Sequence, residues 1–348
     1  MEAQNSFRIL SIDGGGIRGL FPAYFLSQIE NSLRDEGKDE WKIYNYFDLI
    51  CGTSTGGIIA IGLGLGMPAS KIAELYNNHA RDIFGKRKNF FRRILDTKHD
   101  NQILENLLKN YFSEYTNVET PKLGHSKTRL CIPVYDLVNG EPNILKTSHH
   151  ERLIRDYRIP AYQAAMATAS APTYFKPYDI NCKDSTDNES YPLKVDGGVY
   201  ANNPALIGII EAMNGLNINP ERLKVLSLGT GTRKFRQHQF NKKWGLKYWM
   251  SKSRMLELFF QAQSDNIERL VKVMNEGLGK NNSSQFYYKR IQKEFSTKEE
   301  SIKMDESKPE KLKSLKDAAS YLYRNNGDEI RREFFRDSCE KYKPYKEI

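Results

Sequence analysis

The sequence predicts an α/β fold in which helices cover both faces of a mainly parallel β-sheet. Strand-like and helix-like runs alternate along residues 7–228, which is typical of parallel strands joined by crossover helices. Two of the strand-like runs end in glycine-rich turns that lead directly into helix-like runs. Ligands of this fold class bind at the carboxyl ends of the strands, so the two turns are the first places to search for a functional site.

Each strand-like run is short and apolar, and these runs lie at 7–12, 47–52, 129–138, 193–196 and 223–228. The helix-like runs have apolar residues at helical spacing, and they lie at 20–35, 55–65, 70–83, 101–112, 160–169 and 204–214. Residues 241–348 are charged and mostly helical by the same criterion, with an extended stretch at 285–288. The chain is long enough for one large domain or for a domain with a helical appendage.

The first strand-like run ends in the sequence DGGGIRG at 13–19. Successive glycines expose backbone N–H groups that no side chain blocks, and such a nest binds an anion. If the anion is the oxyanion of an acyl-transfer intermediate, its donors are the amides of Gly14, Gly15 and Gly16. Arg18 adds positive charge to this loop, braces it, or is an ordinary solvated arginine.

A second interpretation of the same loop is a dinucleotide-binding turn. The spacing Gly14-x-Gly16-x-x-Gly19 matches that fingerprint, between a strand and a helix. A dinucleotide site also needs an acidic residue at the end of the second strand, whereas residues 51–54 read CGTS. The loop also lacks the lysine of a Walker motif. A non-catalytic module that binds a nucleotide or phosphate through residues 14–19 is therefore the weaker alternative.

The second glycine-rich turn, GTSTG at 52–56, places Ser54 between a strand-like run and a helix-like run. The flanking glycines permit a sharp turn and leave the hydroxyl accessible. The N-terminus of the following helix directs partial positive charge at the hydroxyl, which favours an alkoxide or oxyanion beside it. A glycine-rich helix cap is the simpler alternative, but the strand-turn-helix context favours a nucleophile elbow. Ser54 is thus the candidate nucleophile of a serine hydrolase.

A serine nucleophile needs a base, and Asp196 is the best candidate. It ends the strand-like run 193–196 and precedes two glycines, so its carboxylate is expected to point into the crevice. The next helix has its own cap in Asn203, which frees Asp196 from that role. Among the six histidines, His238 comes late enough for a Ser-Asp-His order, but its polar surroundings predict a solvated loop. We expect a Ser–Asp dyad whose carboxyl pKa is tuned by partial burial.

Together these motifs resemble those of the patatin-like phospholipases. Residues 13–19 match the oxyanion loop of that family, residues 52–56 its nucleophile elbow, and DGG at 196–198 its catalytic aspartate motif. Residues 169–177 and 226–231 are also similar to the segments before and after the aspartate motif. The resemblance covers residues 6–235 and implies a catalytic core with a three-layer patatin-like fold, followed by a mostly helical C-terminal extension at 240–348 that packs on it.

The resemblance also implies the chemistry. Ser54 would attack a lipid ester with Asp196 as base, and the oxyanion would bind Gly14, Gly15 and Gly16 beside Arg18, with the amide of Thr55 as a further donor. The expected reaction is that of a phospholipase A, which releases fatty acids from membrane phospholipids. No metal and no organic cofactor is implied.

A second hypothesis concerns regulation. Compact bacterial patatin-like enzymes that begin almost at the glycine loop resemble anti-phage effectors, which a cyclic nucleotide second messenger activates to degrade the cell's own membrane. The resemblance therefore implies a cyclic oligonucleotide activator for this chain as well. The sequence identifies no nucleotide-contacting residues, and it leaves the oligomeric state open, including a homo-oligomer.

The net charge of +10, from 53 basic and 43 acidic residues, favours anionic partners. Basic residues interleave with Phe90 and Phe91 in the stretch 85–95, which suits an anionic membrane surface, suits a nucleotide, or is simply an exposed loop. We expect a membrane surface as partner and no DNA or RNA duplex.

Compartment is indicated by the cysteines and by the start of the chain. The four cysteines are widely scattered, without the spacing of a disulfide framework or a metal site, which favours a reducing compartment. The first residues show no signal-peptide pattern, and the longest apolar run, 58–67, is too short to span a bilayer. We expect a cytoplasmic protein that acts on membranes from outside the bilayer.

Overall fold

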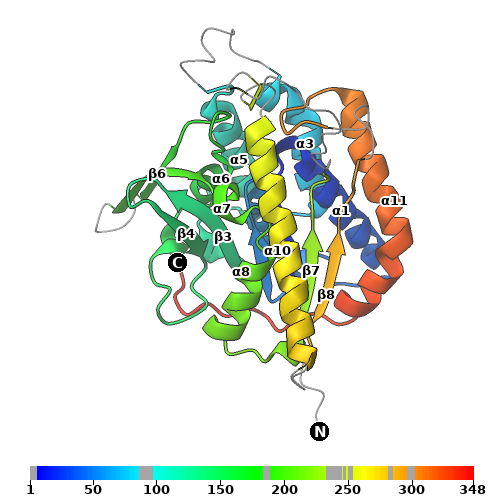
Figure 1. Ribbon diagram of the computed structural model, residues 1–348. Helices are drawn as coiled ribbons and strands as arrows, with labels where there is room; N and C mark the ends of the chain where they lie inside the picture. The colour runs from blue at the N-terminus through cyan, green and yellow to red at the C-terminus, as the bar shows by residue number, and fades with distance from the viewer. Residues whose placement is uncertain are drawn as a thin grey trace.

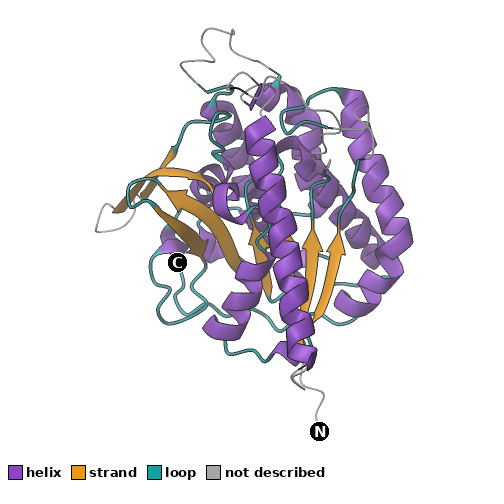
Figure 2. Cartoon of the chain, in the orientation of Figure 1, coloured by secondary structure: helices purple, strands orange, loops and turns teal. Residues whose placement is uncertain are grey.

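The computed structural model describes residues 6–85, 97–182, 189–232, 245, 248–249, 254–280, 285–295 and 302–348. Figures 1 and 2 show a twisted sheet with helices on both sides of it. Within the described residues the sheet has eight strands in the order β5-β6-β3-β2-β1-β7-β8, and β4 pairs with β3.

The strands are β1 (Phe7–Ile12), β2 (Leu49–Gly52), β3 (Arg129–Asp136), β4 (Glu141–Lys146), β5 (Tyr178–Cys182), β6 (Glu189–Asp196), β7 (Leu223–Leu228) and β8 (Tyr287–Ile291). The helices are α1 (Leu20–Asp35), α2 (Thr55–Gly64), α3 (Ala69–Phe84), α5 (Asn101–Thr116), α6 (Ala161–Ala169), α7 (Gly198–Ala201), α8 (Ala205–Ile210), α10 (Arg254–Lys280) and α11 (Pro309–Phe334). A 3₁₀ turn, Gly16–Gly19, precedes α1, and a π-helical turn, Glu211–Gly215, follows α8.

Five neighbouring strands, β3, β2, β1, β7 and β8, run parallel to one another. The strands β4 and β6 are antiparallel to β3, and β5 is antiparallel to β6. The prediction of a mainly parallel sheet flanked by helices is therefore confirmed. Parallel strands end at one edge, so β1, β2 and β7 place the residues that follow them, including Asp13 and Ser54, side by side.

The central strands bury side chains on both faces, which explains why they read as continuous apolar runs. Ile9 of β1 belongs to a core that includes Ile209 of α8 and Val271 of α10. Its neighbour Leu10 points the other way, into the larger core with α1, α2, α3, α6 and α11. In Figure 1, α8 and α10 lie in front of the sheet. The functional edge is thus held between two packed helical layers.

Several predicted bounds are met by the structure, among them 7–12, 223–228 and 20–35. The expected helix 204–214 is shorter, because α8 gives way to the π-helical turn. The sequence analysis missed β4 and β5 altogether. β4 begins with the residues EPN, of which Glu141 and Pro142 are exposed, so it lacks the apolar pattern on which the strand predictions depended.

The C-terminal residues contain the expected helices, α10 and α11, and the stretch predicted to be extended is strand β8. β8 joins the main sheet beside β7, with Ser227 opposite Arg290. Helix α11 lies on the face of the sheet opposite to α10, and there it packs along α1, where the ring centroids of Phe25 and Tyr323 are 5.9 Å apart. The predicted boundary between 235 and 240 lies outside the described residues and stays a prediction.

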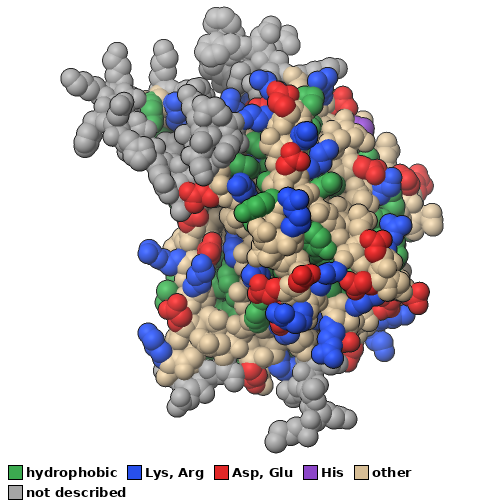
Figure 3. Space-filling view, turned by 90° about the vertical axis from the view of Figure 1, so that its right-hand side faces the viewer, with side chains coloured by type: hydrophobic (Ala, Val, Ile, Leu, Met, Phe, Trp, Pro, Cys, Tyr) green, Lys and Arg blue, Asp and Glu red, His purple; other side chains and the backbone are tan. Residues whose placement is uncertain are grey.

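Figure 3 shows the face on the right-hand side of Figure 1, where basic and acidic side chains are interspersed. The positive net charge is therefore not gathered into one patch on this face. Of the basic stretch 85–95, residues 86–95 lie outside the described residues, as does His238. None of the described helices combines the length and the apolar character needed to cross a membrane.

Candidate active site

Ser54 lies at the sharp turn between β2 and α2. Its φ is 56° and its ψ is −125°, a conformation that a non-glycine residue adopts only when its surroundings enforce it. A Cβ atom at Gly52 would lie 2.0 Å from the Gly56 carbonyl oxygen, and one at Gly56 would lie 2.2 Å from the Ile12 carbonyl oxygen. Both glycines of the GTSTG motif are therefore required, because the turn packs against itself and against β1.

Thr168 of α6 fixes the elbow from the other side. Its Oγ1 accepts the Ser54 N–H at 3.0 Å and donates to the Pro133 carbonyl at 2.7 Å. The nearby Gly57 must lack a side chain, because its Cβ would lie 2.5 Å from Thr168 Cγ2. Sequence analysis did not find Thr168, since nothing in a helix of small residues marks one threonine as a partner of a distant serine.

Asp196 ends β6 with its side chain fully buried. Its Oδ1 accepts the Gly198 N–H at 2.7 Å, while its Oδ2 accepts no hydrogen bond from any described residue. Burial raises the pKa of Asp196 to about 7, and the nearby Ser54 hydroxyl and the Gly198 amide oppose that shift by favouring the ionised form. A carboxyl with one uncommitted oxygen and a pKa near neutrality can accept a proton at physiological pH.

The glycine loop lies directly beside Ser54. A Cβ atom at Gly14 would lie 3.1 Å from Ser54 Cβ and 2.3 Å from Asn202 Oδ1, and one at Gly15 would lie 2.2 Å from Thr230 Oγ1. Gly16 has a φ of 59°, which favours glycine. These glycines are required because protein atoms approach the loop closely.

The loop amides fall into two groups. The Gly14 N–H donates to the Asn202 carbonyl at 3.0 Å, and the Ile17 N–H donates to the Met304 carbonyl at 2.9 Å. Among the described residues, no acceptor takes the N–H of Gly15 or of Gly16. Of the three glycine amides predicted to bind the oxyanion, those of Gly15 and Gly16 are thus available to a ligand, whereas the Gly14 amide is engaged within the protein.

Arg18 is half-buried, and its Nε donates to the Gly15 carbonyl at 3.3 Å. Burial lowers the pKa of Arg18, and the Glu257 carboxylate opposes that shift. Of the interpretations given to Arg18 from the sequence, this geometry favours a brace that holds the loop.

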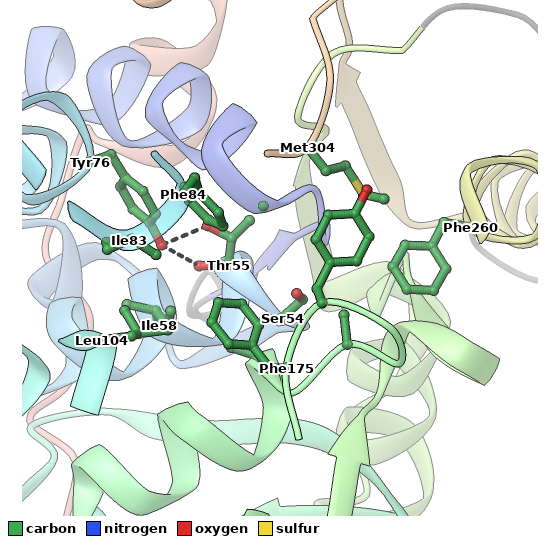
Figure 4. Close-up of a pocket in the computed structure, with 14 residues that line it drawn as sticks. Ser54, Thr55, Ile58, Tyr76, Ile83, Phe84, Leu104, Phe175, Phe260 and Met304 are labelled. Carbon is green, nitrogen blue, oxygen red and sulfur yellow. Dashed lines mark hydrogen bonds between the residues drawn. The ribbon is translucent and has the colours of Figure 1, made fainter. Parts of the chain in front are cut away.

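A pocket opens beside Ser54, and it is almost entirely apolar (Figure 4). It encloses about 510 Å³ of space between atoms, part of it open to solvent. Its lining consists of Gly16, Ser54, Thr55, Ile58, Tyr76, Ile83, Phe84, Leu104, Ala169, Ala171, Tyr174, Phe175, Phe260 and Met304. The Thr55 hydroxyl donates to the Tyr76 hydroxyl at 2.6 Å, so this polar pair is satisfied within the wall. Such a pocket suits a hydrocarbon chain rather than a charged ligand.

No described histidine lines this pocket. His99 packs against Phe84 and Phe175, with ring centroids 5.3 and 5.6 Å apart. His149 instead contacts Glu211, whose carboxylate accepts from it at 2.9 Å. Among the described residues, no histidine is therefore placed to act as the base for Ser54, and Asp196 remains the candidate.

Within the described residues, one set of side chains could hold a metal ion, namely Cys131, His149 and Glu211, whose ligand atoms lie within 4.8 Å of one another. The Lys146 ammonium is 2.5 Å from the Glu211 carboxylate. Glu211 therefore already has a cationic partner. The cluster belongs to neither the elbow nor the pocket.

Comparisons with known proteins identify the family of this chain. The family model described as patatin-like phospholipase matches residues 10–209. A Vibrio cholerae protein named cGAMP-activated phospholipase is 36% identical over 242 residues, which are 65% of this chain and 65% of that protein. Patatin-like protein 2 of Arabidopsis thaliana is 32% identical over 297 residues, which are 76% of this chain and 71% of that protein. The crystal structure of VipD from Legionella pneumophila covers 93% of this chain and 67% of its own, with a TM-score of 0.39 and 13% identity.

The chain thus spans just under two thirds of the length of its Vibrio relative. The matched region 10–209 makes up more than half of this chain, and it contains the glycine loop, Ser54 and Asp196. The resemblance first seen in three short motifs is therefore confirmed over residues 10–209. The chain belongs to the patatin-like phospholipase family.

Proposed function

We propose that this protein is a phospholipase A-type serine hydrolase that acts on membrane phospholipids through a Ser54–Asp196 dyad. One observation carries the proposal: a strained serine that lines an apolar pocket lies beside a buried aspartate with an uncommitted oxygen. A nucleophile, a base and a binding site for an acyl chain are the three parts that lipid ester hydrolysis needs.

In the first step Ser54 Oγ bonds to the ester carbonyl carbon, and its proton passes to Asp196 Oδ2. The carbonyl oxygen takes up the negative charge and is held by the N–H groups of Gly15 and Gly16, with the N-terminus of α2 beside it. We assign Gly14 a different role, since its amide is engaged by Asn202 and its missing side chain permits the close approach to Ser54.

The intermediate then expels the lysophospholipid oxygen, which takes the proton from Asp196. Water attacks the acyl-enzyme with Asp196 again as base, so that the fatty acid leaves and Ser54 recovers its proton. The acyl chain would lie against apolar side chains such as Ile58, Leu104 and Phe175. No cofactor enters either step.

We further propose that a cyclic dinucleotide controls this activity in antiviral defence. Support comes from the relatives named cGAMP-activated phospholipase, which include an Escherichia coli protein 34% identical over 231 residues. The alternative, a non-catalytic nucleotide module built on residues 14–19, is disfavoured because Asn202, Thr230 and Met304 pack closely on the loop. The positive net charge favours anionic membranes as the site of action.

The test is fatty-acid release from phosphatidylglycerol–phosphatidylethanolamine vesicles, with and without cGAMP. With cGAMP, the wild type should release fatty acid, while Ser54→Ala and Asp196→Asn should not. Without cGAMP, none of the three proteins should release it. Ser113→Ala, which alters a half-buried serine of α5 that does not line the pocket, is the matched control and should behave as wild type. Release without cGAMP would reject the proposed control, and release by Ser54→Ala would reject the proposed nucleophile.

A further inference from the structure

The glycine loop begins at Asp13, whose carboxylate is anchored by an arginine from the C-terminal part of the chain. Arg290 Nη1 donates to Asp13 Oδ1 at 2.8 Å, and Nη2 donates to Oδ2 at 2.5 Å. The exposed fractions of the two side chains are only 7% for Arg290 and 2% for Asp13. The Asp13 carboxylate raises the pKa of Arg290, so the guanidinium stays charged in this buried fork.

The sheet places Arg290 where it can reach Asp13. In Figure 1, β7 lies beside β8. β7 also pairs with β1, and Ser227 is opposite both Ser11 and Arg290. The guanidinium extends across β7, where Nη1 also donates to the Ser227 hydroxyl at 2.7 Å. Arg290 lies well beyond residues 10–209, the part of the chain that the family model matches.

A continuous chain of contacts joins this anchor to the loop. The Ser264 hydroxyl of α10 donates to Asp13 Oδ2 at 3.4 Å and accepts from Asn202 Nδ2 at 2.9 Å. The Asn202 carbonyl in turn accepts the Gly14 N–H. At the far end of the loop the Met304 carbonyl accepts the Ile17 N–H. C-terminal residues therefore hold both ends of the loop, whose central amides are uncommitted.

We infer that Arg290 is a positioning residue of the catalytic site: it fixes Asp13 and thereby aims the Gly15 and Gly16 N–H groups at the oxyanion. This inference rests on the proposed function. A bidentate guanidinium fixes both the place and the plane of a carboxylate, which a lysine ammonium does not. A shift of about 1 Å in such donors costs about 100-fold in rate.

The first test is amide hydrogen exchange of the loop, which needs no enzymatic activity. Arg290→Met should speed exchange of the Gly14 and Ile17 amides by about tenfold or more, while the core helix α1 stays protected. Arg290→Lys should give a smaller increase. Lys289→Met is the matched control, because the neighbouring Lys289 pairs with Glu329 of α11 and not with the loop. Loop exchange equal to wild type in Arg290→Met would overturn the inference.

The second test separates positioning from loss of folded protein. We would normalise kcat to the fraction of molecules that react with a fluorophosphonate at long times, and assay a soluble ester and the vesicles, each with and without cGAMP. Arg290→Met should lose about 100-fold in kcat with KM unchanged, Arg290→Lys less, and Lys289→Met nothing. Faster loop exchange with wild-type kcat per reactive site would overturn the positioning role. A wild type that hydrolyses nothing would reject the proposed function instead, and exchange alone would then decide whether Arg290 holds the loop.

Discussion

Replacing Asp196 with asparagine is expected to stabilise the folded protein above pH 7, although it removes the proposed base. Asp196 is fully buried and forms no ion pair with any described residue, and burial raises its pKa to about 7 from an ordinary value of 3.8. At pH 8 the wild-type protein must therefore bury a charge when it folds. Asparagine has nearly the same shape and carries no charge, so the variant avoids that cost.

The magnitude follows from proton linkage. The difference between about 7 and 3.8 corresponds to about 4 kcal/mol of unfolding free energy, at 1.36 kcal/mol per pH unit. Because the pKa of Asp196 is higher in the folded than in the unfolded protein, burial of the neutral carboxyl is compatible with full stability below about pH 3.8. The wild type then loses stability as the pH rises to about 7, because folding increasingly requires Asp196 to stay protonated or to bury its charge. Between pH 5 and pH 8 the wild type should lose about 3 kcal/mol that Asp196→Asn retains.

Urea unfolding at pH 5 and at pH 8, followed by circular dichroism, measures this difference. Any fixed cost of the new amide is the same at both pH values, and it cancels when the two differences between wild type and variant are subtracted. Asp317→Asn, at an exposed position on α11, is the matched control. If the stability difference between wild type and Asp196→Asn is equal at pH 5 and pH 8, Asp196 is not a buried carboxyl with a raised pKa.

Four further predictions concern the base, the elbow and the pocket. Initial rates on a soluble ester should show kcat/KM rising about tenfold per pH unit below pH 7 and levelling above it, as Asp196 ionises. Ser54→Gly should abolish hydrolysis yet raise the unfolding free energy in urea by about 1 kcal/mol, because glycine tolerates a φ of 56°. Thr168→Val should cost about 1–3 kcal/mol of stability in the same assay, because the Ser54 N–H loses its acceptor. Leu104→Trp should shift ester preference toward shorter acyl chains, measured on a series of chain lengths.

The residues expected to meet the substrate could be predicted because each lies in a short local motif. The bend at Ser54 needs glycines two residues away on either side, and the nest at 14–16 is itself a run of glycines. Parallel strands then bring these turns to one edge, where the structure places Ser54 beside both the loop and Asp196. Local chemistry and the general topology of parallel sheets were therefore sufficient to predict these residues and their proximity.

The supporting residues could not be predicted, because each depends on pairing between distant parts of the chain. Arg290 reaches Asp13 across 277 residues of sequence, and only because β8 adds to the sheet with Ser227 opposite it. An extended stretch is predicted at 285–288, but nothing in the YYKRI sequence of β8 indicates that its arginine is buried against a distant aspartate. The engaged Gly14 amide is likewise invisible in the sequence, since its acceptor is the backbone of Asn202.

The two buried carboxylates of this site differ in how their oxygens are used, and that difference separates their roles. Both oxygens of Asp13 accept hydrogen bonds from the Arg290 guanidinium, so this carboxylate is held in a buried ion pair. Asp196 meets no cation among the described residues and keeps Oδ2 uncommitted, so burial alone brings its pKa to about 7. An arginine beside Asp196 would lower that pKa and weaken the base, and the loss of Arg290 from Asp13 would leave a second buried carboxyl next to the oxyanion loop. In the roles proposed here, the position of one arginine on β8 therefore separates the aspartate that anchors the loop from the aspartate that accepts the proton.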